Sequence, residues 1–437
     1  MIQNQIIYLK KYLIKGTIGS FLLKIASTVL SLGISILLAR LLGAEGYGVY
    51  AYVMALIGIL SIPASLGLPN LIVREIAKYN AHSKWGLMRG LLLLTNRAIL
   101  LISILLMLIV GSFSLIFMEK IDYNNIITFW LALFLLPLIS LNAVCQATLR
   151  GLHHVILGQF SESIIKPSLY IMLLGISYIL FYNKMSPFIA MVIQIAVYSV
   201  AFGFSVLWVF RYLPNQAKIT KVSYDTPVWV RSAIPFLFLG GMQVINTSTD
   251  IVMLGLFRSA EEVGVYRVVT SGAQLVTFVL LAVNMALAPT IAKLYSIGDM
   301  QRLQRTITVS TRVILLISLP IALVLIFFGQ QLLYWLFGGE FELGASALAI
   351  LCVGQLVNAS MGSVGVILNM TGYERDSARG VAIGAGVNIV LNSTFIPVWG
   401  IEGAACATAI SMIVWNILLV IWVYKRLGIH STVLGRL

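Results

Sequence analysis

Six charged side chains of this 437-residue sequence are assigned to the depth of long apolar stretches, where each needs a partner or water. Four are basic, Lys24, Arg97, Lys166 and Arg312, and two are acidic, Glu162 and Asp250. Charged side chains in such surroundings are costly and usually mark a ligand site or an ion pathway. The basic surplus favours an anionic ligand, although Arg97 and Arg312 lie close enough to the ends of their stretches for the charge to reach the surface.

For three of these residues, the sequence leaves the role of the charge open. Glu162 and Lys166 are four residues apart with the acid first, which suits an ion pair on one helix face. The pair either lines a transport path or ties helices together. Lys24 lies about 10 Å into its apolar stretch at 1.5 Å per helical residue. Its side chain either extends to the surface or faces an aqueous interior.

The densest polar cluster within an apolar stretch ends at Asp250. Its members are Gln243, Asn246, Thr247, Ser248, Thr249 and Asp250. A lipid-facing helix could not carry all of them, so at least one face must contact protein or water. Asp250 either binds a coupling cation or a proton, or it caps a polar network near the end of its helix; the second interpretation is favoured.

The composition shows which solvent surrounds these residues. Hydrophobic residues make up 60% of the chain and charged residues 10%, more apolar side chain than a water-soluble core absorbs. Crossing ~30 Å of hydrocarbon takes roughly 20 apolar residues. Twelve stretches meet that requirement, near residues 17–42, 48–70, 90–113, 126–149, 156–182, 186–210, 228–257, 265–289, 308–328, 343–370, 379–397 and 403–424. The sequence therefore predicts an all-α membrane protein with twelve transmembrane helices.

The net charge of +14 is explained by the side of the membrane on which the basic residues are predicted to lie. If the stretches alternate from a cytosolic N-terminus, most basic residues fall in inside segments. Only Arg40, Lys120, Lys184, Arg258 and Arg267 fall outside. Because cytosolic loops of membrane proteins carry the excess of Lys and Arg, both termini are predicted to be cytosolic. The charge then suits anionic membrane lipids and gives little reason to expect nucleic acid.

A short motif occurs twice, half the chain apart. Residues 44–50, AEGYGVY, match residues 260–266, AEEVGVY, at five of seven positions. Ile-Ala-Lys at 76–78 recurs at 291–293, and Arg97 corresponds to Arg312. Ordered matches indicate two related halves, which are typical of secondary transporters. The predicted organisation has four parts. They are an interfacial N-terminal segment 1–16, a six-helix lobe 17–213, a cytosolic linker 214–227 and a second six-helix lobe 228–437.

Short amphipathic stretches at 71–89 and 290–307 are predicted to be interfacial helices joining the second and third spans of each half. Pro63, Pro69 and Pro289 are expected to bend or end helices nearby.

No catalytic or metal-binding pattern accompanies these features. Cys145, Cys352 and Cys406 are isolated within apolar stretches and lack the spacing of a metal site or a disulfide framework. The sequence has no phosphate-binding loop, GxSxG or HExxH motif, and the predicted external connections are short. We therefore expect no enzymatic activity, no metal and no cofactor. Coupling to a proton or sodium gradient, or to the membrane potential, is the expected energy source.

Several motifs resemble one family. They are the GAEGYGVY sequence at 43–50 with its repeat, the Arg150-Gly151 turn, and the stretch 386–408 with the pattern N-x3-N-x4-P-x2-G-x2-GAA from Asn388 to Ala405. Over essentially its whole length the chain resembles the polysaccharide exporter branch of the multidrug/oligosaccharidyl-lipid/polysaccharide (MOP) superfamily, the Wzx-type oligosaccharide flippases.

This resemblance implies two pseudo-symmetric six-helix lobes in a V-shaped transporter of the plasma membrane. It implies transport of a polyprenyl-diphosphate-linked oligosaccharide from the inner to the outer leaflet, with polysaccharide polymerases or glycosyltransferases as further partners. Candidate cavity residues are Lys24, Arg97, Glu162, Lys166, Gln243, Asn246, Asp250 and Arg312. A cation-coupled multidrug exporter of the same superfamily and, less favoured, a membrane-embedded glycosyltransferase or polymerase are the alternatives.

Overall fold

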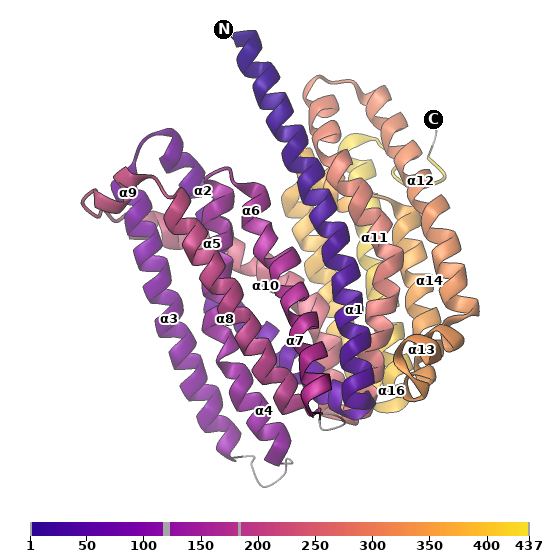
Figure 1. The fold of residues 1–437 in the computed structure, drawn as a ribbon. Helices are drawn as coiled ribbons and strands as arrows, with labels where there is room; N and C mark the ends of the chain where they lie inside the picture. Colours follow the sequence, from indigo (N-terminus) through magenta and orange to yellow (C-terminus); the bar gives the residue numbers. More distant parts are fainter. Residues whose placement is uncertain (1, 117–122, 182–184, 436–437) are drawn as a thin grey trace. The chain divides into compact units, whose positions relative to one another are not determined.

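The computed structural model describes residues 2–116, 123–181 and 185–435, and the described chain is almost entirely helical (Figure 1). Its α-helices are α1 Ile2–Ser65, α2 Leu68–Ala81, α3 Trp85–Ile116, α4 Tyr123–Leu133, α5 Leu135–Gly151, α6 Val155–Phe160, α7 Lys166–Phe181, α8 Pro187–Tyr212, α9 Asn215–Ile219, α10 Thr226–Phe257, α11 Ala260–Ser296, α12 Met300–Phe327, α13 Gly329–Phe337, α14 Ala345–Met361, α15 Val364–Met370 and α16 Glu374–Leu427. A π-helical turn, η2, covers Ser161–Ile165, and a 3-10 turn, η3, covers Gly339–Gly344.

Within the described residues, ten helical stretches are long and apolar enough to cross a membrane. Two of them are too long for one crossing, since 47 residues of α1 extend about 70 Å against ~30 Å of hydrocarbon. Each is broken by a glycine with non-helical backbone angles, Gly43 at φ 68° and Gly400 at φ 56°. A positive φ is strained for other residues, so glycine permits both breaks. The all-α membrane fold is confirmed, and the exact number of twelve spans stays a prediction.

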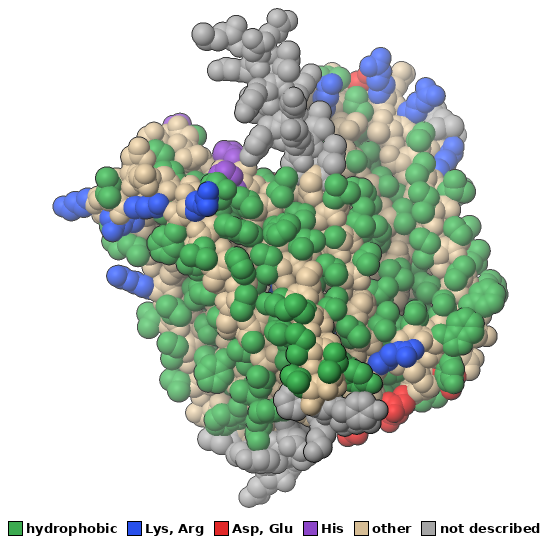
Figure 2. All heavy atoms as spheres, viewed as in Figure 1, with side chains coloured by type: hydrophobic (Ala, Val, Ile, Leu, Met, Phe, Trp, Pro, Cys, Tyr) green, Lys and Arg blue, Asp and Glu red, His purple; other side chains and the backbone are tan. Residues whose placement is uncertain are grey.

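Hydrophobic side chains cover most of the face seen in Figure 2, and Lys and Arg side chains gather toward the ends of the helices. Large apolar residues such as Leu101 and Leu316 are about 70% exposed, at 69% and 73%. Such exposure would be unfavourable in water, and it suits helices that lie in lipid.

The chain forms two compact units whose boundaries differ from the predicted lobes. Unit 1 consists of residues 1–42 and 53–248, and unit 2 of residues 43–52 and 249–437. The predicted linker 214–227 does not divide them, because α10 continues from Thr226 through the boundary and its first part packs in unit 1.

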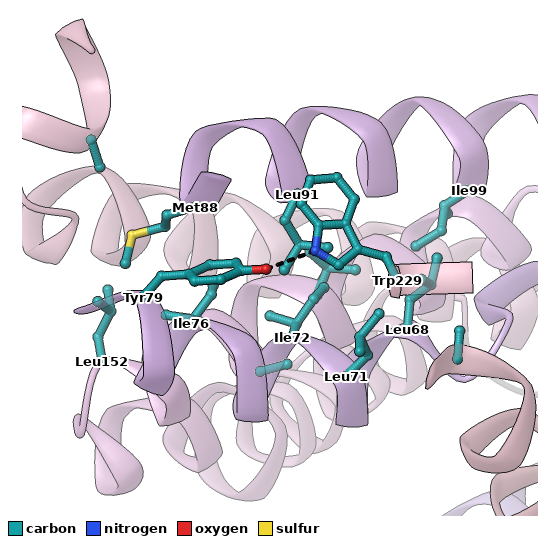
Figure 3. Packing of buried hydrophobic residues seen from close by; sticks show 14 residues of the cluster. Leu68, Leu71, Ile72, Ile76, Tyr79, Met88, Leu91, Ile99, Leu152 and Trp229 are labelled. Atoms are coloured by element: carbon teal, nitrogen blue, oxygen red, sulfur yellow. Dashed lines mark hydrogen bonds between the residues drawn. The ribbon is translucent and has the colours of Figure 1, made fainter. Parts of the chain in front are cut away.

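The packing of Trp229 explains why the start of α10 belongs to unit 1. Trp229 is 1% exposed and lies in a hydrophobic cluster with residues of α2 and α3 (Figure 3). Its indole Nε1 donates a 2.8 Å hydrogen bond to the hydroxyl of Tyr79. Burial raises the pKa of Tyr79, so the hydroxyl stays protonated near neutral pH. This cluster anchors the beginning of the second half of the sequence to unit 1.

The linker itself is fixed against α3. The Ser223 backbone N–H donates a 3.1 Å hydrogen bond to the Gly86 carbonyl. A Cβ atom on Gly86 would lie 2.7 Å from the Lys221 carbonyl oxygen, and one on Gly90 would overlap the Ser223 carbonyl oxygen. The two glycines therefore allow the chain to cross α3 at backbone distance.

Three other local predictions have different outcomes. A short helix is present near the predicted 71–89, as α2, with Pro69 in its first turn, and its place at the membrane interface stays a prediction. The prediction for 290–307 was wrong, since α11 continues past Pro289 to Ser296 and α12 begins at Met300. A proline inside a membrane helix is tolerated where neighbouring groups satisfy the freed backbone. The predicted interfacial segment 1–16 is also not separate, because α1 begins at Ile2.

The two copies of the repeated motif meet within unit 2. A Cβ atom on Gly48 would overlap the Ala260 carbonyl oxygen and lie 2.9 Å from the Gly264 nitrogen. Reciprocally, a Cβ on Gly264 would overlap the Ala44 carbonyl oxygen and lie 2.9 Å from the Gly48 nitrogen. The first turns after Gly43 and the first turns of α11 therefore cross with backbone against backbone, in a self-complementary contact of the small-residue type.

This crossing of Gly48 and Gly264 predicts a large effect of one methyl group. Gly264→Ala should destabilise the protein by about 1–3 kcal/mol, because the added carbon meets main-chain atoms that cannot move aside locally. The measurement is the midpoint of thermal unfolding in detergent micelles. Gly203→Ala is the matched control, since a Cβ there meets nothing within 4 Å. Equal midpoints for the two variants would contradict the close crossing.

Candidate functional site

The stretch α6–η2–α7 carries the ion pair predicted from sequence. Its helix widens at Ser161–Ile165, where the Lys166 N–H bonds to the Ser161 carbonyl, five residues back. Pro167 follows directly, and proline lacks an N–H and crowds the carbonyl four residues before it. Such π turns are rare and often occur at functional sites. The proline thus gives a local reason for the irregular turn that presents Glu162.

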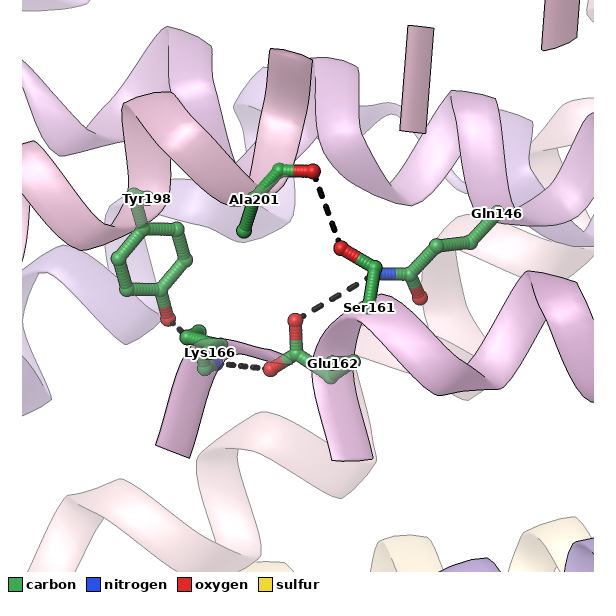
Figure 4. A network of polar contacts seen from close by, with 6 residues as sticks. All are labelled: Gln146, Ser161, Glu162, Lys166, Tyr198 and Ala201. Atoms are coloured by element: carbon green, nitrogen blue, oxygen red, sulfur yellow. Dashed lines mark hydrogen bonds and ion pairs between the residues drawn. The ribbon is translucent and has the colours of Figure 1, made fainter. Parts of the chain in front are cut away.

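Glu162 and Lys166 belong to a polar network inside unit 1 (Figure 4). Lys166 Nζ forms an ion pair with Glu162 Oε1 and donates a 2.9 Å hydrogen bond to the Tyr198 hydroxyl on α8. The ammonium also lies 4.4 Å from the centre of the Tyr198 ring. Gln146 Nε2 on α5 donates a long 3.4 Å bond to Glu162 Oε2. Three helices are therefore joined through one carboxylate and one ammonium.

The two charges of the network differ in accessibility. The Glu162 side chain is 43% exposed, whereas that of Lys166 is 18% exposed. A ligand would reach the carboxylate first, and an anion would have to compete with Glu162 for the ammonium. The carboxylate and Gln146 offer hydrogen bonds to hydroxyl groups, and Tyr198 adds an aromatic ring. Such groups suit a polyhydroxylated ligand, with Lys166 as a second, more protected contact for an anion.

The other predicted residues of unit 1 differ in their exposure to the surroundings. Lys24, Arg97 and Gln243 are exposed, and Asn246 is half-buried. Of the predicted set, Glu162 and Lys166 are the pair that direct contacts join. Lys24, Arg97, Gln243 and Asn246 stay predictions as ligand contacts.

A second polar network surrounds Asp250 in unit 2. Asp250 is 7% exposed. Its Oδ1 accepts a 2.6 Å hydrogen bond from Asn392 Nδ2, and its Oδ2 accepts bonds from the Tyr266 hydroxyl at 3.0 Å and from Thr408 Oγ1 at 2.5 Å. Asn392 Nδ2 also donates to Asn388 Oδ1 at 2.9 Å. A network of this kind was the favoured prediction for Asp250, and its partners are all uncharged.

One atom of this network has no hydrogen-bond partner in the structure. Asn392 Oδ1 is buried and unpaired, although its own amide nitrogen serves both Asp250 and Asn388. An unpaired buried acceptor is costly unless a proton donor or a cation satisfies it. The surroundings of Asp250 thus combine a negative charge with free acceptor capacity.

The sequence reasoning missed the partners that complete both networks. Tyr198 and Gln146 stand alone in apolar helices and give no periodic signal. Asn388 and Asn392 are four residues apart on α16, so their shared helix face was detectable. Tyr266 closes the repeated motif, but nothing local shows that it faces Asp250.

Arg312, the last predicted residue, lies on α12 in unit 2. Its guanidinium donates to two backbone carbonyls, those of Val433 and Gly435, both at 3.2 Å. Its side chain therefore holds the chain segment that follows α16, and its role as a cargo ligand stays a prediction.

Comparison with known proteins adds the family. The model of the family described as "Polysaccharide biosynthesis protein" matches residues 13–295, which is more than half of the chain. The chain belongs to the polysaccharide biosynthesis protein family. A second model, MatE, matches residues 235–394, which include Asp250, Asn388 and Asn392.

Named relatives of this polysaccharide biosynthesis protein cover most of its length. It is 25% identical over 386 residues to the probable low-salt glycan biosynthesis flippase Agl15 of Haloferax volcanii, covering 87% of this chain and 77% of the relative. It is also 25% identical over 411 residues to a putative O-antigen transporter of Shigella flexneri, covering 89% and 92%.

Solved structures confirm the predicted fold of this family member. An inward-facing multidrug resistance MATE transporter of the MOP superfamily matches with a TM-score of 0.76 at 15% identity, covering 92% of this chain and 94% of that one. The lipid II flippase MurJ in an inward closed conformation matches with a TM-score of 0.74 at 15% identity, covering 94% and 87%. The chain thus has the fold of these MOP superfamily transporters.

The Glu162–Lys166 pair of this family member predicts non-additive mutations. Lys166→Gln removes the cation and leaves Glu162 without its partner, so the variant should lose more stability than the double variant Glu162→Gln/Lys166→Gln. A coupling of about 1 kcal/mol is expected from a double-mutant cycle of thermal unfolding in detergent. The exposed Lys293→Gln should change stability by less than about 0.5 kcal/mol. Strictly additive effects would show that the two side chains do not interact.

Proposed function

We propose that this protein is a flippase, which moves a polyprenyl-diphosphate-linked oligosaccharide, the repeat unit of a cell-surface glycan, from the inner to the outer leaflet. The named relatives, a glycan biosynthesis flippase and an O-antigen transporter, support this class of cargo. They also favour transport over catalysis, because both are named as flippase or transporter.

The observation that carries the proposal is the network of Glu162, Lys166 and Tyr198. It places a carboxylate and a protected cation of the η2–α7 stretch beside the aromatic ring and hydroxyl of Tyr198 on α8, all within apolar helices. The glycan would bind the accessible carboxylate, and the diphosphate would compete for Lys166. The polyprenyl tail would remain in lipid, where its transfer to a protein interior gains nothing.

The proposed direction of transport fits the charge of the cargo. A diphosphate carries about two negative charges, and a membrane potential that is negative inside favours outward movement by roughly 2.3 kcal/mol per charge per 100 mV. We place the protein in the plasma membrane with both termini in the cytosol, on the distribution of Lys and Arg along the sequence. Polymerases and glycosyltransferases of the same glycan are the proposed partners in the membrane.

A multidrug exporter is the second candidate function. It is favoured by the MatE match and by the carboxylate of Asp250, whose hydrogen-bonding partners are all uncharged. Cationic drugs would need acidic groups near their path, whereas Glu162, an accessible acid of unit 1, is already paired with Lys166. The pairing makes the glycan cargo the better-supported proposal.

The cargo proposal predicts the behaviour of cells that lack their own flippase for a surface glycan. The unmodified chain should restore export, and Glu162→Gln should reduce it about tenfold or more, as expected for the loss of a hydrogen bond to a charged group. Surface glycan is measured per molecule of protein in the membrane, with Lys293→Gln as the control. Normal export by both Glu162→Gln and Lys166→Gln would remove this network from the cargo path. Drug resistance in place of glycan export would favour the second candidate.

We further propose that Asp250 couples transport to a cation gradient. Asp250, Asn388, Asn392 and Thr408 supply carboxylate, amide and hydroxyl oxygens, which are ligands for hard cations such as sodium. A proton is the other candidate, since it would satisfy the unpaired Asn392 Oδ1 through a rearranged network.

This coupling predicts a selective loss in Asp250→Asn. The variant keeps the shape of the side chain, so the protein should fold, while export should lose its dependence on an imposed sodium or pH gradient. Export is measured in membrane vesicles under each gradient separately. If the variant responds to both gradients as the unmodified chain does, Asp250 is not the coupling residue.

A further inference from the structure

The segment that follows α16 is held by side chains of another helix. Gly428 ends α16 with φ 68°, and residues 429–435 then run along unit 2. Ile429 is 3% exposed in a hydrophobic cluster, whereas Leu434 is 92% exposed. Apolar burial therefore anchors the beginning of the segment much more than its end. We refer to residues 429–435 as the C-terminal segment.

One face of α12 makes most of the polar contacts to the C-terminal segment. Gln304 pairs with both backbone groups of His430, accepting from its N–H and donating to its carbonyl, each at 2.8 Å. The Thr311 hydroxyl lies 3.0 Å from the Ser431 carbonyl and 3.0 Å from the Ile307 carbonyl of its own helix, and it can donate to either. Arg312 Nε and an Arg312 terminal nitrogen donate to the carbonyls of Val433 and Gly435. The Val433 N–H donates to the Ser360 carbonyl at the end of α14, at 3.0 Å.

These donors occupy positions i, i+7 and i+8 of α12 and therefore lie along one side of the helix. Apart from a second bond of Gln304 Nε2, to Thr308 Oγ1 at 2.9 Å, they are directed at backbone oxygens. The guanidinium of Arg312 carries a full charge, but the oxygens that it binds here belong to neutral amides. A phosphate oxygen would make the bonds of the neutral donors Gln304 and Thr311 charge-assisted, which makes them roughly twice as strong, and it would give the Arg312 cation a negatively charged partner.

The position of Arg312 along α12 suits a lipid headgroup. It is the thirteenth residue of the helix, about 18 Å from the start at Met300. The exposed Arg302 and Arg305 lie nearer the start of the same helix. Since long cationic side chains extend toward the headgroup region, all three guanidinium groups can reach a phosphate layer at that end.

We propose that Gln304, Thr311 and Arg312 form a binding site for the phosphate of an anionic lipid headgroup, which the C-terminal segment occupies with its carbonyl oxygens until lipid displaces it. Binding of the phosphate releases the segment from α12 and, through Val433, from Ser360 of α14. The site does not require the transported cargo, so it stands independently of the flippase proposal.

The test follows the position of the C-terminal segment in the full-length protein. Cys145, Cys352 and Cys406 are replaced by Ala, and spin labels are attached at Leu434→Cys and Gln301→Cys, both exposed positions. Electron spin resonance gives the distribution of distances between the labels in lipid nanodiscs. In phosphatidylcholine alone the distribution should be narrow, and an equal mixture with phosphatidylglycerol should add a broad, longer component. Adding inorganic phosphate to phosphatidylcholine discs separates a soluble anion from a lipid as the source.

Two variants decide whether Arg312 is responsible. Arg312→Gln should abolish the response to phosphatidylglycerol, while Arg305→Gln, a loss of the same charge on the same helix, should keep it. A response to inorganic phosphate equal to that of the lipid would support the site and assign it to a soluble anion. An unchanged narrow distribution in phosphatidylglycerol would overturn the proposal. So would a response that survives in Arg312→Gln.

Discussion

The structure of unit 2 depends on a contact between main chains where no side chain fits. Gly48 and Gly264 stand at equivalent places of the repeated motif, and each leaves space for the backbone of the other. The same region holds both broken helices. The Ala44 N–H, directly after the break at Gly43, donates a 2.6 Å hydrogen bond to Glu340. Beside the break at Gly400, Arg258 binds the carbonyls of Ile396 and Pro397. The first turn of α11 is thus the point around which two interrupted helices are organised.

The contacts at the two helix breaks are required because the surrounding solvent is lipid. A backbone group left free in hydrocarbon costs several kcal/mol, so a chain that turns within a long helix must pair the exposed N–H and carbonyl groups. Glu340 and Arg258 perform this task at the two breaks with opposite charges, the acid on an N–H and the base on carbonyls. The same rule explains the two polar networks. Lys166 and Asp250 each lie in an apolar helix, and each has at least two hydrogen-bonding partners.

Much of this could be predicted from the sequence because lipid imposes simple requirements. The length of the apolar stretches predicted a membrane protein. The four-residue spacing of Glu162 and Lys166 predicted an ion pair that the structure contains. The exchange of residues 43–52 and 228–248 between the predicted lobes could not be predicted, because it depends on long-range packing of Trp229 and of the glycine crossing. The role of Arg312 was hidden for a similar reason. Its partners are backbone carbonyls more than a hundred residues away, and backbone groups leave no trace in a sequence.

The repeated motif and the family patterns have different physical origins. The repeat records a packing requirement, since Gly48 and Gly264 are needed for close approach. The Asn388 and Asn392 pattern records a polar one, since both residues belong to the network of Asp250. The glycines of the repeat therefore shape the fold, whereas the two asparagines belong to a network that can bind an ion or a cargo.

The central claim is that the protein carries a lipid-linked glycan across the membrane. Its most direct test is reconstitution of the purified chain into liposomes whose outer leaflet contains a fluorescent oligosaccharide linked to polyprenyl diphosphate. Quenching of the fluorophore from one side follows its exchange between leaflets. The account predicts exchange that depends on the protein and is slowed by Glu162→Gln. Exchange no faster than in protein-free liposomes, with cationic drugs transported instead, would contradict it.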